Sequence, residues 1–144
     1  MVFVDTGGWI AMAVKRDRYH KKAATYYRKL SKDKVRLVTS NYVLVETYTR
    51  IRYDDCHAKA LQFNALIQDA IKAGRLNLEW VTPAIHKEAW DIFESYADQD
   101  FSFVDCTSFV IAKRVGVKEA FGFDDHFKTM GLILKPGSKP SLTR

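Results

Sequence analysis

The chain has 144 residues, 47% of them hydrophobic, which is enough for one folded domain with a core of its own. No run of about eighteen apolar residues occurs, so we expect no membrane span. Lys and Arg number 23 against 17 Asp and Glu, a formal net charge of +6, and such an excess attracts polyanions without proving that they bind.

The first residues are predicted to form a strand rather than a leader sequence. Residues 1–5 are an apolar run ending in Asp5, with no positively charged flank, which argues against a secretory signal peptide. The cysteines, Cys56 and Cys106, lie far apart and form no C-x-x-C pair, which argues against a zinc site or a disulfide framework. Reduced thiols are typical of cytoplasmic proteins, and we predict that location.

The first half of the chain is predicted to alternate between strands and helices. Helix formers occupy residues 9–14, after a turn at Gly7 and Gly8. Apolar residues at helical spacing predict a helix over residues 20–32, and alternation predicts a strand over residues 35–39.

A helix over residues 41–52 is predicted to begin at Ser40 as its N-cap. This helix is apolar nearly all round, so we expect it to be buried in the fold or covered by a partner. The next helix is predicted over residues 54–73, with Gly74 just after its end.

The second half continues the alternation. The predicted elements are a strand over 76–81, a helix from Thr82–Pro83 to about 96, a helix from Ser102 to Gly116, and strands over 120–123 and 131–134. Strands alternating with helices predict an α/β fold with a parallel sheet covered on both faces, its strand order left open. We assign residues 1–134 to this domain and residues 135–144 to a flexible basic tail.

Four acids occupy positions where a solvated charge is not expected. Asp5 and Asp124 follow predicted strands, Asp105 lies in the first turn of a helix, and Glu46 lies within the apolar helix. Each has a structural alternative when taken alone. Glu46 is placed to pair with Arg50 one turn on, Ser102-x-x-Asp105 matches a capping box, and the other two acids suit a cap and a turn.

Taken together, the four acids predict a metal site if they converge. Carboxylates clustered without a cation repel one another, and some would stay protonated at neutral pH. Oxygen ligands without a Cys or His cluster suit Mg²⁺ or Mn²⁺ rather than zinc. In a basic protein, such a site indicates nucleic-acid cleavage.

Five segments, in order along the chain, resemble the PIN-domain family, specifically the VapC-type toxin nucleases of bacterial and archaeal toxin–antitoxin pairs. The second has the form D-x-x-H-x-x-A, the fourth contains S-x-x-D, and the fifth reads F-D-x-H-F. The segments are residues 2–6, 17–23, 39–46, 100–109 and 123–127. The resemblance covers the chain up to the basic tail.

The resemblance implies a three-layer α/β/α fold with a mainly parallel sheet, Mg²⁺- or Mn²⁺-dependent endoribonuclease activity, homodimers and an antitoxin protein that blocks the site. By resemblance, the catalytic metal ligands are Asp5, Glu46, Asp105 and Asp124. Asp125 is a reserve acid, and the Thr6 hydroxyl is expected near the metal. Gly7 stands where many relatives have Ser or Asn, and Gly122 where many have Thr.

Other functions remain as alternatives at this point. A catalytically weak or inactive PIN-type domain that binds RNA or acts as a scaffold is the first, and the intact acids argue against it. A DNA-directed 5′-nuclease needs extra elements for which 144 residues leave little room. A phosphoacceptor domain needs paired acids where Asp5 is followed by Thr6. We expect His126 to face solvent or cap a helix rather than contact phosphate.

Overall fold

The computed structural model describes residues 1–137, and within them five strands form a parallel sheet. The strands are β1 (Val2–Val4), β2 (Leu37–Ser40), β3 (Leu76–Glu79), β4 (Glu119–Gly122) and β5 (Ile133–Pro136). Their order in the sheet is β3-β2-β1-β4-β5, and every neighbouring pair is parallel. The order reverses direction between β1 and β4, which makes the sheet doubly wound.

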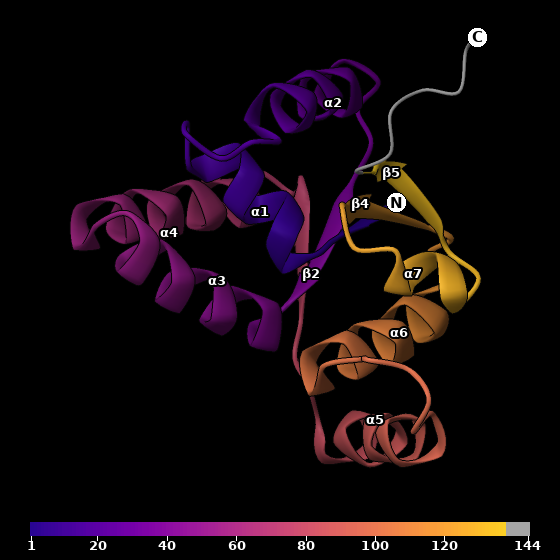
Figure 1. Cartoon of the computed structure of the whole chain (residues 1–144). Coiled ribbons are helices and arrows are strands. Elements are labelled where there is room, and N and C mark those ends of the chain that lie inside the picture. The colour runs from indigo at the N-terminus through magenta and orange to yellow at the C-terminus, as the bar shows by residue number, and fades with distance from the viewer. Residues whose placement is uncertain (138–144) are drawn as a thin grey trace, which may run out of the picture.

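Helices cover both faces of this sheet. They are α1 (Thr6–Ala13), α2 (His20–Lys32), α3 (Asn41–Asp54), α4 (His57–Lys72), α5 (Pro83–Ser95), α6 (Phe103–Val115) and α7 (His126–Thr129). The first four lie on one side of the strands and the last three on the other (Figure 1). The predicted three-layer α/β/α fold with a parallel sheet is therefore confirmed.

The middle of the sheet brings two predicted acids together. β1 pairs with β2 on one side and with β4 on the other. Asp5 directly follows β1, and its backbone N–H donates to the carbonyl of Phe121 in β4. Asp124 lies two residues beyond the end of β4. Both acids therefore stand at the carboxyl edge of the sheet where the strand order reverses, which is the usual ligand site of such folds.

Several helix ends follow local signals that were predicted. The Ser40 hydroxyl accepts from the backbone N–H of Val43, and the Thr82 hydroxyl accepts from that of Ile85. Gly116 ends α6 in the left-handed conformation, with φ of 81°. These capping bonds satisfy backbone groups that a helix end would otherwise leave unpaired.

Several predicted boundaries are wrong. α4 begins at His57 rather than residue 54, and the short helix α7 was not predicted. β5 ends at Pro136, two residues inside the stretch assigned to the tail. The rest of that tail, residues 138–144, lies outside the described residues. The expectation for α3 also changes: Val43 and Ile51 are fully buried, whereas Val45 is 62% exposed.

Gly7 and Gly8 do not form the predicted turn, because both lie inside α1. A Cβ atom at Gly8 would stand 2.6 Å from the carbonyl oxygen of Phe121, so this glycine allows the helix to lie directly against β4. The indole N–H of Trp9 donates to Thr39 Oγ1, whose hydroxyl donates to the carbonyl of Val4. These two bonds join α1, which begins immediately after Asp5, to β2 and, through Thr39, to β1.

No helix among the described residues is long and apolar enough to cross a membrane.

Replacing Gly8 by Ala should lower the free energy of unfolding by about 1–3 kcal/mol, because its Cβ would meet the rigid backbone of β4. Gly7→Ala is the matched control, since a Cβ there meets nothing within 4 Å. That control should leave stability unchanged or raise it by up to about 1 kcal/mol, because alanine favours a helix. Urea unfolding of both variants measures the difference. Equal stability of the two variants would contradict the close contact.

Candidate active site

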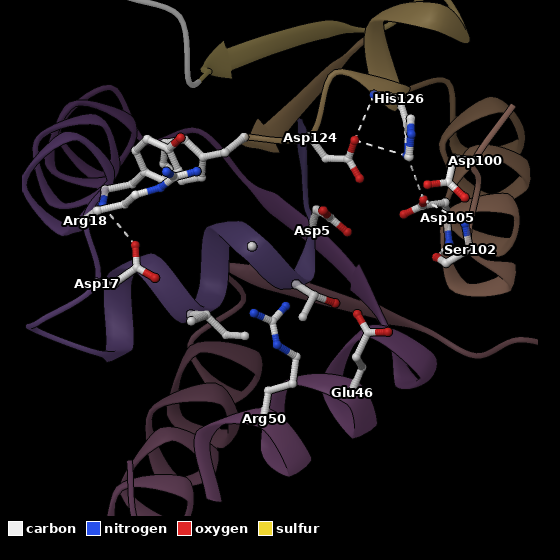
Figure 2. Close-up of a pocket in the computed structure, with 15 residues that line it drawn as sticks. Asp5, Asp17, Arg18, Glu46, Arg50, Asp100, Ser102, Asp105, Asp124 and His126 are labelled. Atoms are coloured by element: carbon white, nitrogen blue, oxygen red, sulfur yellow. Dashed lines mark hydrogen bonds and ion pairs between the residues drawn. The ribbon is translucent and has the colours of Figure 1, made fainter. Parts of the chain in front are cut away.

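A pocket of about 600 Å³ opens at the carboxyl edge of the sheet, beside the ends of β1 and β4 (Figure 2). Six carboxylates line it: Asp5, Asp17, Glu46, Asp100, Asp105 and Asp124. The volume lies within the range of small-ligand sites. All four acids predicted for the site therefore face one cavity, from four different segments of the chain.

Asp5 lies at the centre of this pocket and is only 6% exposed. Burial, together with the charges of Asp105, Asp124 and Glu46, raises the pKa of its carboxyl to about 7, against an opposing backbone hydrogen bond at Thr6. A carboxyl group with this pKa is half protonated at neutral pH. Positive charge that enters the pocket shifts it toward the ionised form.

Asp105 both caps a helix and lines the pocket. Its Oδ2 accepts from the backbone N–H of Ser102 at 3.0 Å, and its own N–H donates to the Ser102 hydroxyl at 2.9 Å, which completes a capping box at the start of α6. The same side chain lines the pocket and is 7% exposed. Burial raises its pKa, with a further contribution from Asp124, although the hydrogen bonds from Ser102 and His126 oppose the rise.

His126 lies between two of the acids, a position that was not predicted from the sequence. Its Nδ1 is 3.1 Å from Asp105 Oδ2 and 3.1 Å from Asp124 Oδ1. One ligand atom from each of these three residues lies within 4.8 Å of the others, a spacing that can hold a metal ion. Burial lowers the pKa of His126, but the hydrogen bond to Asp105 and the two acidic charges outweigh it and raise the pKa overall.

The sequence did contain a signal for this histidine. His126 follows Asp124 by two residues, and the Asp124 carboxylate accepts the backbone N–H of His126 at 2.9 Å. An acid that binds the backbone two residues on makes a tight turn. Such a turn holds the histidine ring beside the acid from which it begins.

Glu46 reaches the pocket from α3 and is half-buried. Among residues 1–137, no ion pair joins it to Arg50, although both side chains line the same cavity. The alternative of a structural Glu46–Arg50 pair is therefore wrong for the described structure. Asp125, the reserve acid, does not line the pocket and instead pairs with Lys128 at the surface.

The donor set fits a hard divalent cation. The Thr6 hydroxyl also lines the pocket, is buried, and has no hydrogen-bond partner among the described residues. A buried hydroxyl without a partner is costly unless water or a ligand satisfies it. Carboxylate oxygens with a hydroxyl beside them are the kind of ligand that Mg²⁺ and Mn²⁺ prefer. The pocket thus has the chemistry of a metal site, held by the central strands and two helices.

Fold, pocket and sequence agree on one class of protein. The chain belongs to the PIN-domain family, whose domain matches residues 2–132. It is similar to the 23S rRNA-specific endonuclease VapC20 in two strains of Mycobacterium tuberculosis, with 32% identity over 133 residues, 92% of this chain and 96% of each relative. A crystal structure of Mycobacterium tuberculosis VapC20, titled a sarcin-ricin loop cleaving toxin, matches with a TM-score of 0.79 and 30% identity, covering 92% of this chain and 97% of that one. The predicted resemblance is confirmed.

In metal-free protein, the stability should depend on pH through Asp5. The pKa of this group is 3.8 as a free side chain and about 7 when folded, so between those values the folded state binds a proton that the unfolded state lacks. Stability therefore falls as pH rises through this window. Asp5→Asn should remove the fall and be more stable than wild type at pH 8 by on the order of 2 kcal/mol.

Urea unfolding in EDTA from pH 4 to pH 8 measures this dependence. Asp125→Asn is the matched control, because it removes an exposed acid outside the pocket, and it should change stability by less than about 0.5 kcal/mol. Parallel curves for wild type and Asp5→Asn would show that Asp5 does not carry the buried charge.

Proposed function

We propose that this protein is a metal-dependent endoribonuclease and the toxin of a type II toxin–antitoxin system. In this proposal, Asp5, Glu46, Asp105 and Asp124 hold Mg²⁺ or Mn²⁺ against an RNA phosphodiester. The observation that carries it is the convergence of these four acids, from four separate segments, on one pocket at the switch point of the sheet.

The relatives support the RNA substrate. Similarity extends over 92% of this chain and nearly all of VapC20, so it is not confined to a shared motif. VapC20 is named for cleavage of 23S rRNA, and the net charge of +6 on the present chain favours encounter with any RNA. Which RNA this chain cleaves is a separate question, because substrate choice depends on the walls of the pocket.

The residues of the pocket have different roles in this proposal, which follow from their charge and position. A divalent cation, when bound, supplies Lewis-acid stabilisation of the charge that develops on the phosphate and an activated water for hydrolysis. Asp5 lies deepest among the acids and loses its proton as positive charge arrives. The Asp105 carboxylate is held in place by its bond to Ser102, and His126 orients Asp105 and Asp124 through Nδ1.

The alternative is a catalytically weak or inactive domain that binds RNA or serves as a scaffold. Gly7 supports this alternative in one respect, because it lines the pocket without a polar side chain. The buried carboxyl of Asp5 argues against this alternative. An acid with a pKa near 7 beside three other acids destabilises the folded protein if the site never binds a cation.

The proposal also includes an antitoxin, a homodimer and a location in the cytoplasm. Four large apolar side chains are exposed on α3 and α4: Val45, Tyr53, Leu61 and Leu66. Leu66 also lines an apolar cavity of about 410 Å³, together with residues of α1, α2 and α4 such as Trp9, Tyr27 and Phe63. Exposed apolar surface of this kind is typical of protein interfaces.

Cleavage of single-stranded RNA should require Mg²⁺ or Mn²⁺ and stop in EDTA. Asp5→Asn or Asp124→Asn should lower the cleavage rate by about a hundredfold or more, because each removes a charged ligand while leaving the fold intact. Asp125→Asn, outside the pocket, is the matched control and should cleave normally. Labelled RNA on denaturing gels measures the rates, and unchanged cleavage by Asp5→Asn would refute the mechanism.

The protein should sediment as a dimer at tens of micromolar, a concentration at which a standard interface is normally populated (~1,600 Å² buried). Leu66→Glu should shift it toward monomer, because the change places a charge on an exposed apolar side chain of α4. Gln68→Glu adds the same charge at an exposed polar position of that helix and should have little effect. A wild-type monomer at this concentration would count against the dimer.

A further inference from the structure

The D-x-x-H stretch before α2 has a structural role that the metal site does not explain. The Asp17 carboxylate accepts the backbone N–H of Tyr19 at 2.9 Å, and the Asp17 carbonyl accepts that of His20. His20 Nδ1 lies 2.8 Å from the carbonyl oxygen of Ala11 in α1. These bonds fasten both ends of a tight turn. The two residues between them, Arg18 and Tyr19, are therefore held in a fixed position at the pocket.

An aromatic stack supports Arg18 within this turn. The Tyr19 ring lies parallel to that of Phe123, with centroids 4.3 Å apart and an interplanar angle of 6°. The Arg18 guanidinium carbon lies 4.5 Å from the Tyr19 ring centroid, on the scale of a cation–π contact. Phe123 directly precedes Asp124, so the stack joins Arg18 to the segment that carries one of the four acids.

Arg18 and Arg50 add two cationic groups to a pocket that six carboxylates line. Both line the cavity, and neither forms an ion pair with any residue in the described part of the chain. Figure 2 shows Arg18 on the side of the cavity away from Asp105 and His126, with Asp5 between them. An unpaired guanidinium beside so many carboxylates keeps its N–H donors available for an anionic ligand.

We propose that Arg18, held on the Tyr19–Phe123 stack, binds an RNA phosphate that neighbours the scissile phosphate, with Arg50 as a second contact. This inference rests on the proposed ribonuclease function and deepens it. A stacked guanidinium presents its N–H groups in one plane, which matches two phosphate oxygens and requires little ordering on binding. The acids exclude a bare phosphate from their own end of the pocket. The strand would therefore be anchored at Arg18, and its next phosphate would approach the acids only when a divalent cation offsets their charge.

RNA binding can be measured apart from cleavage in an Asp5→Asn background, using fluorescence anisotropy of a labelled single-stranded RNA in Mg²⁺ over a range of KCl. Arg18→Ala should weaken binding about tenfold, the effect of one charge-assisted contact. The slope of log affinity against log salt should also fall by about 0.7, the value for one phosphate contact to a single strand.

Arg16→Ala is the matched control, because Arg16 is exposed, lies two residues away, and does not line the pocket. Affinity of this variant should stay within about twofold of the parent, since it loses only a distant charge. Arg18→Lys keeps the charge without the planar fork and should recover only part of the affinity. Tyr19→Leu keeps Arg18 but removes its support, and should weaken binding in the same direction.

Thermal melting of each variant checks that it folds, and Arg18→Gln replaces Arg18→Ala in the comparison if the latter melts far lower. Equal affinities and equal salt slopes for the Arg18 variant and Arg16→Ala would overturn the inference, even if wild-type protein cleaves RNA. If wild-type protein cleaves no RNA yet the Arg18 variant loses affinity and salt slope, the phosphate contact stands and the ribonuclease proposal fails.

Discussion

The burial of the Asp5 carboxyl among three other acids is the constraint on which the rest of this structure depends. The carboxyl stands where the strand order reverses, at the end of a strand that pairs on both sides, so it cannot move toward solvent without disturbing the centre of the sheet. The raised pKa of Asp5 reflects the free-energy cost of burying its ionised carboxyl at that position. A cation that relieves the cost gains affinity from it, because binding and charge relief occur together. The buried acidic charge that destabilises the fold is therefore also the feature that favours a cation in the pocket.

The elements around Asp5 can be understood as supports for this arrangement. Gly8 lets α1 lie against β4, and the Trp9 and Thr39 hydrogen bonds hold α1 to the strands on which the acid depends. On the opposite wall, Asp17 and His20 hold a turn that carries Arg18 beside the Asp17 carboxylate. Arg18 therefore lies across the pocket from Asp105 and His126 (Figure 2). If Arg18 binds phosphate as proposed, it orients a polyanion, since only one direction places phosphate near this arginine and leaves the proposed metal ligands free.

Local signals in the sequence predicted the elements well, whereas contacts between distant residues were less accessible. Ser40, Thr82 and Gly116 act within one turn of their own helices, so a short window of sequence contains the whole interaction. Gly8 was misread as a turn because the oxygen that requires a glycine there belongs to Phe121, more than a hundred residues away. Of the site, the acids were predicted by resemblance and by their places at strand ends, in the first turn of a helix or within an apolar helix. The stacking of Tyr19 on Phe123 left no pattern in either segment.

Asp105 shows why structural and functional interpretations of one residue need not compete. The backbone N–H of Ser102 stabilises its charged form, and so does the positive end of α6, while burial and Asp124 favour its neutral form. An acid held in this way keeps its direction whether or not a cation is present. Asp5 sits deeper, and burial dominates its pKa. Two acids of one pocket therefore differ in how firmly they hold a proton. In the proposed metal site, the direction of the capped acid is fixed before a cation binds, whereas the buried one would ionise as a cation binds, so we expect cation affinity to rise with pH through the range where Asp5 titrates.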